Sequence, residues 1–476
     1  MIYKIFYLIY VFLIISLCLI FTTIALVFYL WGKVDFALII ENAHMVQSVP
    51  LLHYWKEIVC GLFLMISFSC FLIRYRKLGC FCLMSVFFAL LYQLKEDVPE
   101  TFLYSKYYMV PDSVQLKDQP KNIIVVSLES MTNLWTFEDV IRTKEPIIPH
   151  LLQLQKEGIS FNGWKPMVFM LPTIPSYTSI LCGVTRPSHV GSITEALWQD
   201  EAYGGYPKAT CISDILHKNG YRTFYVMGGT IQEERADNLT LFHSFDVAYG
   251  KKELLKAGYG LKEKEAGFGA QGHYIPDSVL FQFVKDTLTQ HQDKPFFMSV
   301  ILSNTHGPDH GYVEPFCDKK YDGDIRDAYR CIDQIVFDFV KWCKEQPFFK
   351  NTVIYLVGDH TPWDKQIANT GLVYLATYKY PKEHIYNVVI DGGNPKYQVI
   401  DKEFSQIDWA PTILESAGFI IEPRRIGLGV SLWSNEETLI EEFGKQKLDE
   451  MLKGSIDDYH QILYGDKKIK QIEEMK

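Results

Sequence analysis

Four short apolar runs, rich in β-branched residues, most constrain the fold of this chain. Nearly continuous apolar runs of this length are typical of strands that are buried on both faces of a parallel sheet. Segments with apolar residues three and four positions apart lie between them and predict helices at 211–220, 276–291 and 324–346. Strands that alternate with helices predict an α/β fold, with a doubly wound, mostly parallel central sheet between helices. The four runs are 122–129, 223–228, 295–303 and 352–359.

The first hundred residues are much more hydrophobic than the remainder. Residues 5–31 carry no charge, and about 20 apolar residues suffice to span a bilayer. The apolar core of a cleaved signal peptide is only about 7–15 residues long, so a retained helix is favoured. Two further uncharged runs, 58–73 and 78–94, are separated by a basic loop that belongs in the cytoplasm. The sequence therefore predicts a transmembrane region at 1–96 with these three spans.

The rest of the chain divides by composition. Residues 97–120 are polar and rich in proline, which indicates a linker, and 121–435 carry the strand and helix pattern of a catalytic domain. Residues 436–476 form a charged segment of helical pattern, to which we assign no role. Because the loop at 74–77 and Lys4 are both expected to face the cytoplasm, the part of the chain after the spans is expected on the outer side of the membrane. The net charge is −9, with no basic block, which argues against nucleic acid as a partner.

Acidic and imidazole side chains follow three of the predicted strands. Glu129 ends the first run, Asp359 and His360 end the fourth, and His306 and His310 follow the third. A single such residue is more often a helix cap or a hydrogen-bonded side chain than a ligand. Because ligands gather at the carboxyl ends of parallel strands, three occupied ends indicate a site. Glu129, Asp359 and His360 offer two oxygens and one nitrogen, which suit one Zn²⁺ or Mn²⁺ ion with a fourth position open.

The stretch LPTIPSYTSILCG, residues 171–183, begins a helix with two hydroxyl side chains, Thr173 and Ser176. Capping is the commoner explanation, because Ser, Thr and Pro are favoured in the first turn. A helix N-terminus also attracts phosphate, and a metal ion lowers the pKa of a hydroxyl that it binds. Thr173 would then be a fourth metal ligand and the nucleophile that attacks phosphorus.

TIPSYTSILCG resembles the nucleophile element of sulfatases, with Thr173 at the nucleophile position. Three further segments are similar to segments of that family and follow the order found in the alkaline phosphatase superfamily. They are NTVIYLVGDH, YPKATCISDILHKNGYRTFYV and QIDWAPTILESAGF. Thr173 cannot form the aldehyde that sulfatases require, and Tyr177 replaces their Arg. A Thr nucleophile is typical of the membrane-anchored phosphoglycerol and phosphoethanolamine transferases, such as lipoteichoic acid synthases. SNTHGPDHGY and GLGVSLWS most resemble the phosphoglycerol transferases of periplasmic glucans.

The resemblance implies a metal-dependent transferase in a bacterial inner membrane, with its catalytic domain on the periplasmic or extracellular side. The headgroup of phosphatidylglycerol or phosphatidylethanolamine would pass to Thr173 and then to a surface glycan or lipid. A phosphodiesterase or sulfatase-type hydrolase on the same fold is the alternative, and a membrane-bound binding protein that lost the chemistry is a third. Substrate contacts are expected from His306, His310 and His273. Ser176 is expected there too, one helical turn beyond Thr173, where it would also support the turn through a hydrogen bond.

Five cysteines lie in the outer part, where an oxidising compartment permits disulfides. The odd number leaves at least one of them free. Cys182 follows the nucleophile helix and Cys211 begins the next helix, whereas Cys317 and Cys331 flank one loop. We predict the pairs Cys182–Cys211 and Cys317–Cys331, with five free thiols as the alternative.

The predicted topology is tested by a reporter enzyme that works only outside the cytoplasm. We expect such a reporter to be active when fused after Lys476 and inactive when fused after Tyr75, in the basic loop. A fusion after Lys476 that is active only with a cytoplasmic reporter would contradict the three-span topology.

Overall fold

The computed structural model of the protein describes residues 101–116, 119–136, 138–141, 143–167, 173–185, 204–260, 274–306, 311–362 and 385–465. The three predicted spans lie outside these residues. Among the helices that are described, none is both long enough and apolar enough to cross a membrane.

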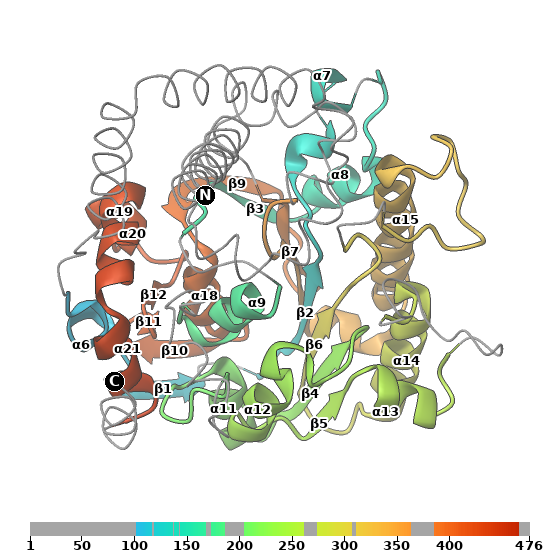
Figure 1. Cartoon of the computed structure of the whole chain (residues 1–476). Helices are drawn as coiled ribbons and strands as arrows, with labels where there is room; N and C mark the ends of the chain where they lie inside the picture. Colours follow the sequence, from blue (N-terminus) through green and yellow to red (C-terminus); the bar gives the residue numbers. More distant parts are fainter. Residues whose placement is uncertain are drawn as a thin grey trace, which may run out of the picture. The chain divides into compact units, whose positions relative to one another are not determined.

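An eight-stranded sheet crosses the domain, in the order β5-β4-β6-β2-β7-β8-β3-β9 (Figure 1). The predicted strands are confirmed as β2, β4, β6 and β7, which are neighbours and all parallel. β8 runs antiparallel to both β7 and β3, so the sheet is mostly rather than wholly parallel. The bounds are β2 Asn122–Leu128, β3 Ile159–Trp164, β4 Arg222–Met227, β5 Val247–Tyr249, β6 Phe296–Ile301, β7 Thr352–Gly358, β8 Asn387–Asp391 and β9 Gln398–Phe404.

Helices cover both faces of the sheet, as the doubly wound pattern predicts. Every residue of β2 is buried, and successive side chains point to opposite faces. Ile123 and Val125 therefore join one apolar core and Ile124 and Val126 the other. The first core contains α9 Thr173–Cys182, α11 Ile212–Lys218 and α18 Trp409–Ser416, and the second contains α8 Pro149–Gln155, α14 Asp277–Gln290 and α15 Ile325–Lys344.

Part of the segment predicted as a linker packs on the catalytic domain. Its α6 (Leu103–Tyr107) contacts α21 (Ile456–Leu463), and its β1 (Ser113–Leu116) pairs antiparallel with β10 (Phe419–Glu422). The Ser105 amide donates to Asp458 Oδ2 at 2.9 Å. The described part of the charged C-terminal segment contains α19 (Leu439–Phe443), α20 (Lys445–Gly454) and α21, and α21 contacts α6.

Two disulfides join the cysteine pairs proposed from the sequence. Cys182, the last residue of α9, is bonded to Cys211, the N-cap of α11, and Cys317 is bonded to Cys331 in α15. Cys343 is the free cysteine among the described residues, and it is buried. The bonds close loops with sequence separations of 29 and 14, a constraint worth roughly 3 kcal/mol each in the chain-entropy picture.

His460 on α21 generates a prediction about pH. Both ring nitrogens are buried and form no hydrogen bond within the described part of the chain, and burial lowers the pKa of His460 to about 4. The ring is neutral in both the folded and the unfolded chain above about pH 6.5. Between about pH 6.5 and 4 the unfolded chain binds a proton that the folded chain does not, so the free energy of unfolding falls by roughly 3 kcal/mol.

The variant His460→Phe keeps an aromatic ring and loses the titration. Its free energy of unfolding, measured by urea denaturation, is expected to fall less than that of the parent protein between pH 6.5 and pH 4. Parallel pH profiles for the two proteins would contradict this role of His460.

Candidate active site

The site is built at the carboxyl ends of two neighbouring parallel strands. β2 and β7 pair in register up to Leu128 and Gly358, so the next residue of each strand, Glu129 and Asp359, lies beside the other. These carboxyl groups are 2% and 0% exposed. Two carboxylates brought together in the interior repel one another strongly unless a cation lies between them.

His360 and Thr173 complete the cluster. His360 Nε2 lies 3.5 Å from Glu129 Oε1 and 3.7 Å from Asp359 Oδ2. Thr173, the first residue of α9, donates its hydroxyl to Glu129 Oε2 at 2.8 Å, and its Oγ1 lies 3.3 Å from His360 Nε2. The structure thus brings together all four residues that the sequence analysis assigned to the metal and the nucleophile.

The donor set fits a divalent cation. The ligand atoms of Glu129, Asp359 and His360 all lie within 4.8 Å of one another, and Asp359 Oδ2 is buried without a hydrogen-bond partner among the described residues. His360 Nδ1 lies 2.8 Å from the Thr361 carbonyl oxygen. Because that oxygen only accepts, Nδ1 carries a proton, so Nε2 is the nitrogen left to bind a cation, and it must be deprotonated to do so.

The surroundings shift the pKa values of the two carboxyl groups in opposite directions. Burial, reinforced by the neighbouring Glu129 charge, raises the pKa of Asp359 to about 7. Burial also acts to raise the pKa of Glu129. The imidazoles of His360 and His306 and the hydroxyls of Ser130 and Thr173 outweigh it, and hold that pKa below its usual value. A bound cation would allow both groups to stay ionised.

Ser130 fixes the two carboxylates relative to one another. Its φ is 54°, in the left-handed region that is costly for a non-glycine residue. This conformation directs its amide to Asp359 Oδ1 at 2.8 Å, while its hydroxyl donates to Glu129 Oε1 at 2.7 Å. The sequence analysis missed Ser130, because nothing in the pattern distinguishes the serine after a strand from an ordinary turn residue.

Ser176 is not placed to contact a substrate, which corrects the sequence-based expectation. Its side chain is fully buried in α9, and its hydroxyl donates to the Asp359 carbonyl oxygen. It therefore supports the turn after β7, the second role expected of it. Gln406 donates to the same carbonyl oxygen and accepts a hydrogen bond from Trp164 Nε1 at 2.9 Å.

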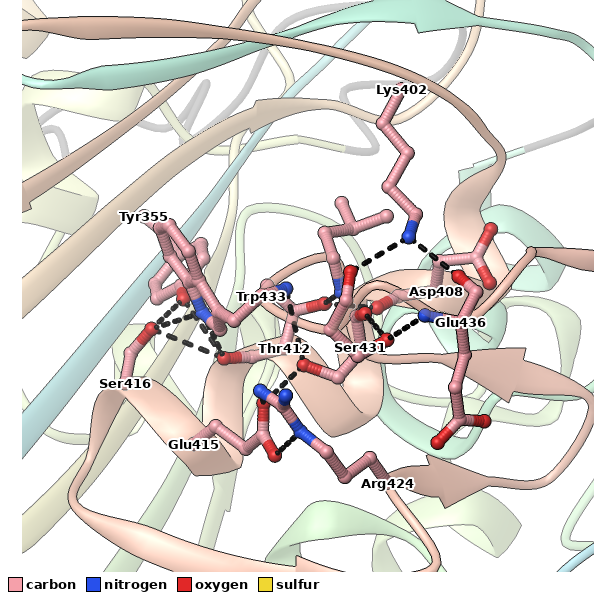
Figure 2. Close-up of polar contacts among 12 residues, drawn as sticks. Tyr355, Lys402, Asp408, Thr412, Glu415, Ser416, Arg424, Ser431, Trp433 and Glu436 are labelled. Atoms are coloured by element: carbon pink, nitrogen blue, oxygen red, sulfur yellow. Dashed lines mark hydrogen bonds and ion pairs between the residues drawn. The ribbon is translucent and has the colours of Figure 1, made fainter.

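Gln406 directly precedes a polar network in the chain (Figure 2). It belongs to η6 (Gln406–Asp408), which leads directly into α18. Figure 2 shows α18 tied to the following segment: Trp433 Nε1 donates to the Thr412 carbonyl oxygen at 3.0 Å, and Arg424 forms a bidentate pair with Glu415. Asp408 in η6 joins this network by accepting a hydrogen bond from the Val430 amide at 2.9 Å, and η6 packs on α9.

His306 lies just beyond β6, at the same edge of the sheet, and lines a small pocket together with Thr173 and Glu129. Glu233 and Tyr274 line it too, and the sequence analysis missed both. The sequence offered only weak indications of these two residues. Glu233 follows β4 after a Gly-Gly pair, and Tyr274 follows His273, which was expected to contact the substrate. His273 and His310 lie outside the described residues.

A second group of possible metal ligands is structural. Cys211, Asp214 and His243 lie close together, but the Cys211 sulfur is in a disulfide. Asp214 accepts from the Cys211 amide and pairs with His243 Nδ1 at 2.8 Å, while His243 Nε2 lies 2.8 Å from the Gly205 carbonyl oxygen. These contacts join the N-terminus of α11 to α12 (Ala236–Phe242).

Residues 121–419 match the family model described as Sulfatase. The chain belongs to the sulfatase family. Among curated sulfatase-family relatives it is similar to phosphoglycerol transferase I of Escherichia coli O6:K15:H31 (strain 536 / UPEC), with 25% identity over 339 residues. The aligned region covers 70% of this chain and 41% of that relative, so the chain spans less than half of the relative's length.

Solved structures place the sulfatase-family domain in the alkaline phosphatase-like fold. A protein of the alkaline phosphatase superfamily from Vibrio parahaemolyticus matches with a TM-score of 0.52 and 18% identity, over 71% of this chain and 79% of that one. The lipoteichoic acid synthase LtaP from Listeria monocytogenes matches with a TM-score of 0.50 and 20% identity, over 67% and 78% of the two chains. At these identities the likeness establishes the fold.

The two hydroxyls of α9 make a matched pair for testing the site. Thr173→Ala should lower turnover by at least about 10³-fold with folding intact, because covalent catalysis needs that oxygen. Thr173→Ser should retain part of the activity. Ser176→Ala should keep most turnover and lose about 1 kcal/mol of stability, because a buried carbonyl loses a donor.

The amount of bound metal in the same variants distinguishes the loss of a nucleophile from the loss of a metal ligand. Asp359→Asn should lose both turnover and bound metal, whereas Thr173→Ala should keep most of its metal, as measured by elemental mass spectrometry. A Thr173→Ala protein with normal turnover would overturn the assignment of the nucleophile.

Proposed function

We propose that this sulfatase-family protein is a membrane-bound, metal-dependent phosphotransferase. It moves the headgroup phosphate of phosphatidylglycerol or phosphatidylethanolamine to a cell-surface glycan or lipid, through a covalent intermediate on Thr173. The observation that carries the proposal is the contact of the Thr173 hydroxyl with two of the three clustered metal-ligand residues, Glu129 and His360. The curated phosphoglycerol transferase relatives support the same class of reaction.

One Zn²⁺ or Mn²⁺ ion would be held by four residues, namely Glu129, Asp359, His360 and, as the fourth ligand, Thr173. Such an ion lowers the pKa of a bound hydroxyl and offsets charge on the phosphoryl oxygens. Zn²⁺ and Mn²⁺ both accept this mixed set of oxygen and nitrogen donors.

The protein's own groups carry the remaining steps. Glu129 Oε2 accepts the hydrogen bond of the Thr173 hydroxyl and orients the nucleophile. Thr173 Oγ1 gives up its proton and bonds to phosphorus while the bond from phosphorus to the diacylglycerol oxygen breaks, and that oxygen takes up a proton. An acceptor hydroxyl then gives up its proton and bonds to phosphorus, the bond from phosphorus to Thr173 Oγ1 breaks, and Oγ1 takes up a proton. His306, at the edge of the pocket, contacts the transferred group.

The lipid donor explains why such an enzyme would be tethered to a membrane. Residues 5–31, 58–73 and 78–94 supply the predicted spans, and α6 begins a few residues later, at Leu103. Such spans would tether the catalytic domain to the membrane that carries its donor.

A transferase and a hydrolase are separated by the fate of the headgroup. The full chain in detergent, given a phospholipid with a labelled headgroup, is expected to release diacylglycerol and to label an added glycan or glycolipid acceptor. Thr173→Ala should do neither. Release of the free labelled headgroup phosphate at the same rate with and without acceptor would favour the phosphodiesterase, and cleavage of sulfate esters alone would favour a sulfatase.

A further inference from the structure

The pocket next to Thr173 contains a carboxylate that the proposed chemistry does not use. Glu233 begins η3 (Glu233–Arg235), after β4, and lines the same pocket as Thr173 and His306. The pocket has a volume of about 50 Å³, room for about three to four water-sized groups. A short end group fits into this space.

Glu233 is held in a defined position. Tyr274 donates its hydroxyl to Glu233 Oε1 at 2.9 Å, and the same hydroxyl lies 3.5 Å from His306 Nε2. On the other side Glu233 Oε2 lies against Gly229, where a Cβ would approach to 2.3 Å. A side chain at Gly229 would displace the carboxylate, so the Gly-Gly turn after β4 creates its place.

The described residues that line the pocket offer one basic side chain, His306, against the negative charges that meet there. A divalent ion would offset the charges of Glu129 and Asp359, which leaves the Glu233 carboxylate together with the negative phosphodiester of the substrate. The described residues that line the pocket include no lysine or arginine. Arg235, two residues beyond Glu233, is paired with Asp237 at 3.6 Å and is not among the lining residues.

Aromatic rings form another part of the wall. The Tyr274 and His306 rings pack at 5.0 Å between centroids, tilted by 40°. A carboxylate beside aromatic faces is the usual environment for an ammonium group, which gains both an ion pair and a cation–π contact. An uncharged diol would gain only a hydrogen bond and would leave the second negative charge in place.

Resting on the proposed function, we infer that Glu233, oriented by Tyr274, is the residue that selects the transferred headgroup. It binds a terminal amine, so the enzyme takes the phosphoethanolamine class of donor. The curated relatives are named for phosphoglycerol transfer, so this chain would differ from them in the headgroup that it transfers.

The test compares two lipids with the full chain in detergent micelles. Diacylglycerol release is measured from phosphatidylethanolamine and phosphatidylglycerol that carry the same acyl chains. The parent protein is expected to show the higher kcat/KM with the ethanolamine lipid. Glu233→Gln keeps the shape and removes the charge, and should lower that value by roughly tenfold or more, with less than about threefold effect on the glycerol lipid.

Two further variants control for structure. Tyr274→Phe keeps the ring and removes the hydrogen bond to Glu233, so it should shift the lipid preference in the same direction by a smaller factor. Glu345→Gln, at the exposed C-cap of α15, should leave both lipids unchanged. Competition by phosphoethanolamine and by glycerol phosphate provides a second readout, since the stronger inhibition by phosphoethanolamine should disappear in Glu233→Gln.

The outcomes separate this inference from the proposed function. Preference for the glycerol lipid in the parent protein, or an equal loss with both lipids in folded Glu233→Gln, would overturn the role of Glu233 while Thr173-dependent release still supports the transferase. Absence of Thr173-dependent diacylglycerol release from either lipid would overturn the transferase, and the headgroup assignment with it.

Discussion

Two buried carboxylates at the ends of neighbouring parallel strands are the constraint on which the rest of this site depends. Because β2 and β7 pair in register, Glu129 and Asp359 lie side by side and are almost completely buried. Such a pair is stable when a cation lies between the two charges, and costly otherwise. In the proposed mechanism Thr173 depends on this pair. Its hydroxyl contacts the same cluster, and a bound cation would lower the pKa of that hydroxyl and make it a nucleophile.

Much of the surrounding structure holds this pair still. Backbone and side-chain donors reach Asp359 from three separate elements, through Ser130, Ser176 and Gln406. The Cys182–Cys211 disulfide fixes the far end of α9, whose first residue is Thr173, the proposed nucleophile. The network around α18 in Figure 2 then keeps η6 in contact with α9. Catalysis of phosphoryl transfer depends on positioning, and these contacts supply it.

The sequence was sufficient for the four central strands and for the meeting of Glu129, Asp359 and His360, because a continuous apolar run marks a buried strand and the residues after it mark the sheet edge. It was insufficient for β9, where exposed and half-buried residues alternate, as on the open face of an edge strand. It was also insufficient for Glu233 and Tyr274, whose meeting depends on how the segments after β4 and before α14 fold back. The prediction for Ser176 rested on its position in the helix. Its burial and its hydrogen bond to the Asp359 carbonyl oxygen depend on tertiary packing, which the sequence pattern does not show.

The central claim is that the cluster of Glu129, Asp359 and His360 makes Thr173 a covalent nucleophile, and one measurement addresses it directly. The full chain is incubated with phospholipid donor in the absence of acceptor, quenched, digested and analysed by peptide mass spectrometry. The account predicts that the peptide containing Thr173 gains the mass of the headgroup phosphate, on Thr173 itself, and that Asp359→Asn gains none. An adduct on Ser176, or diacylglycerol release with no adduct at either position, would contradict it.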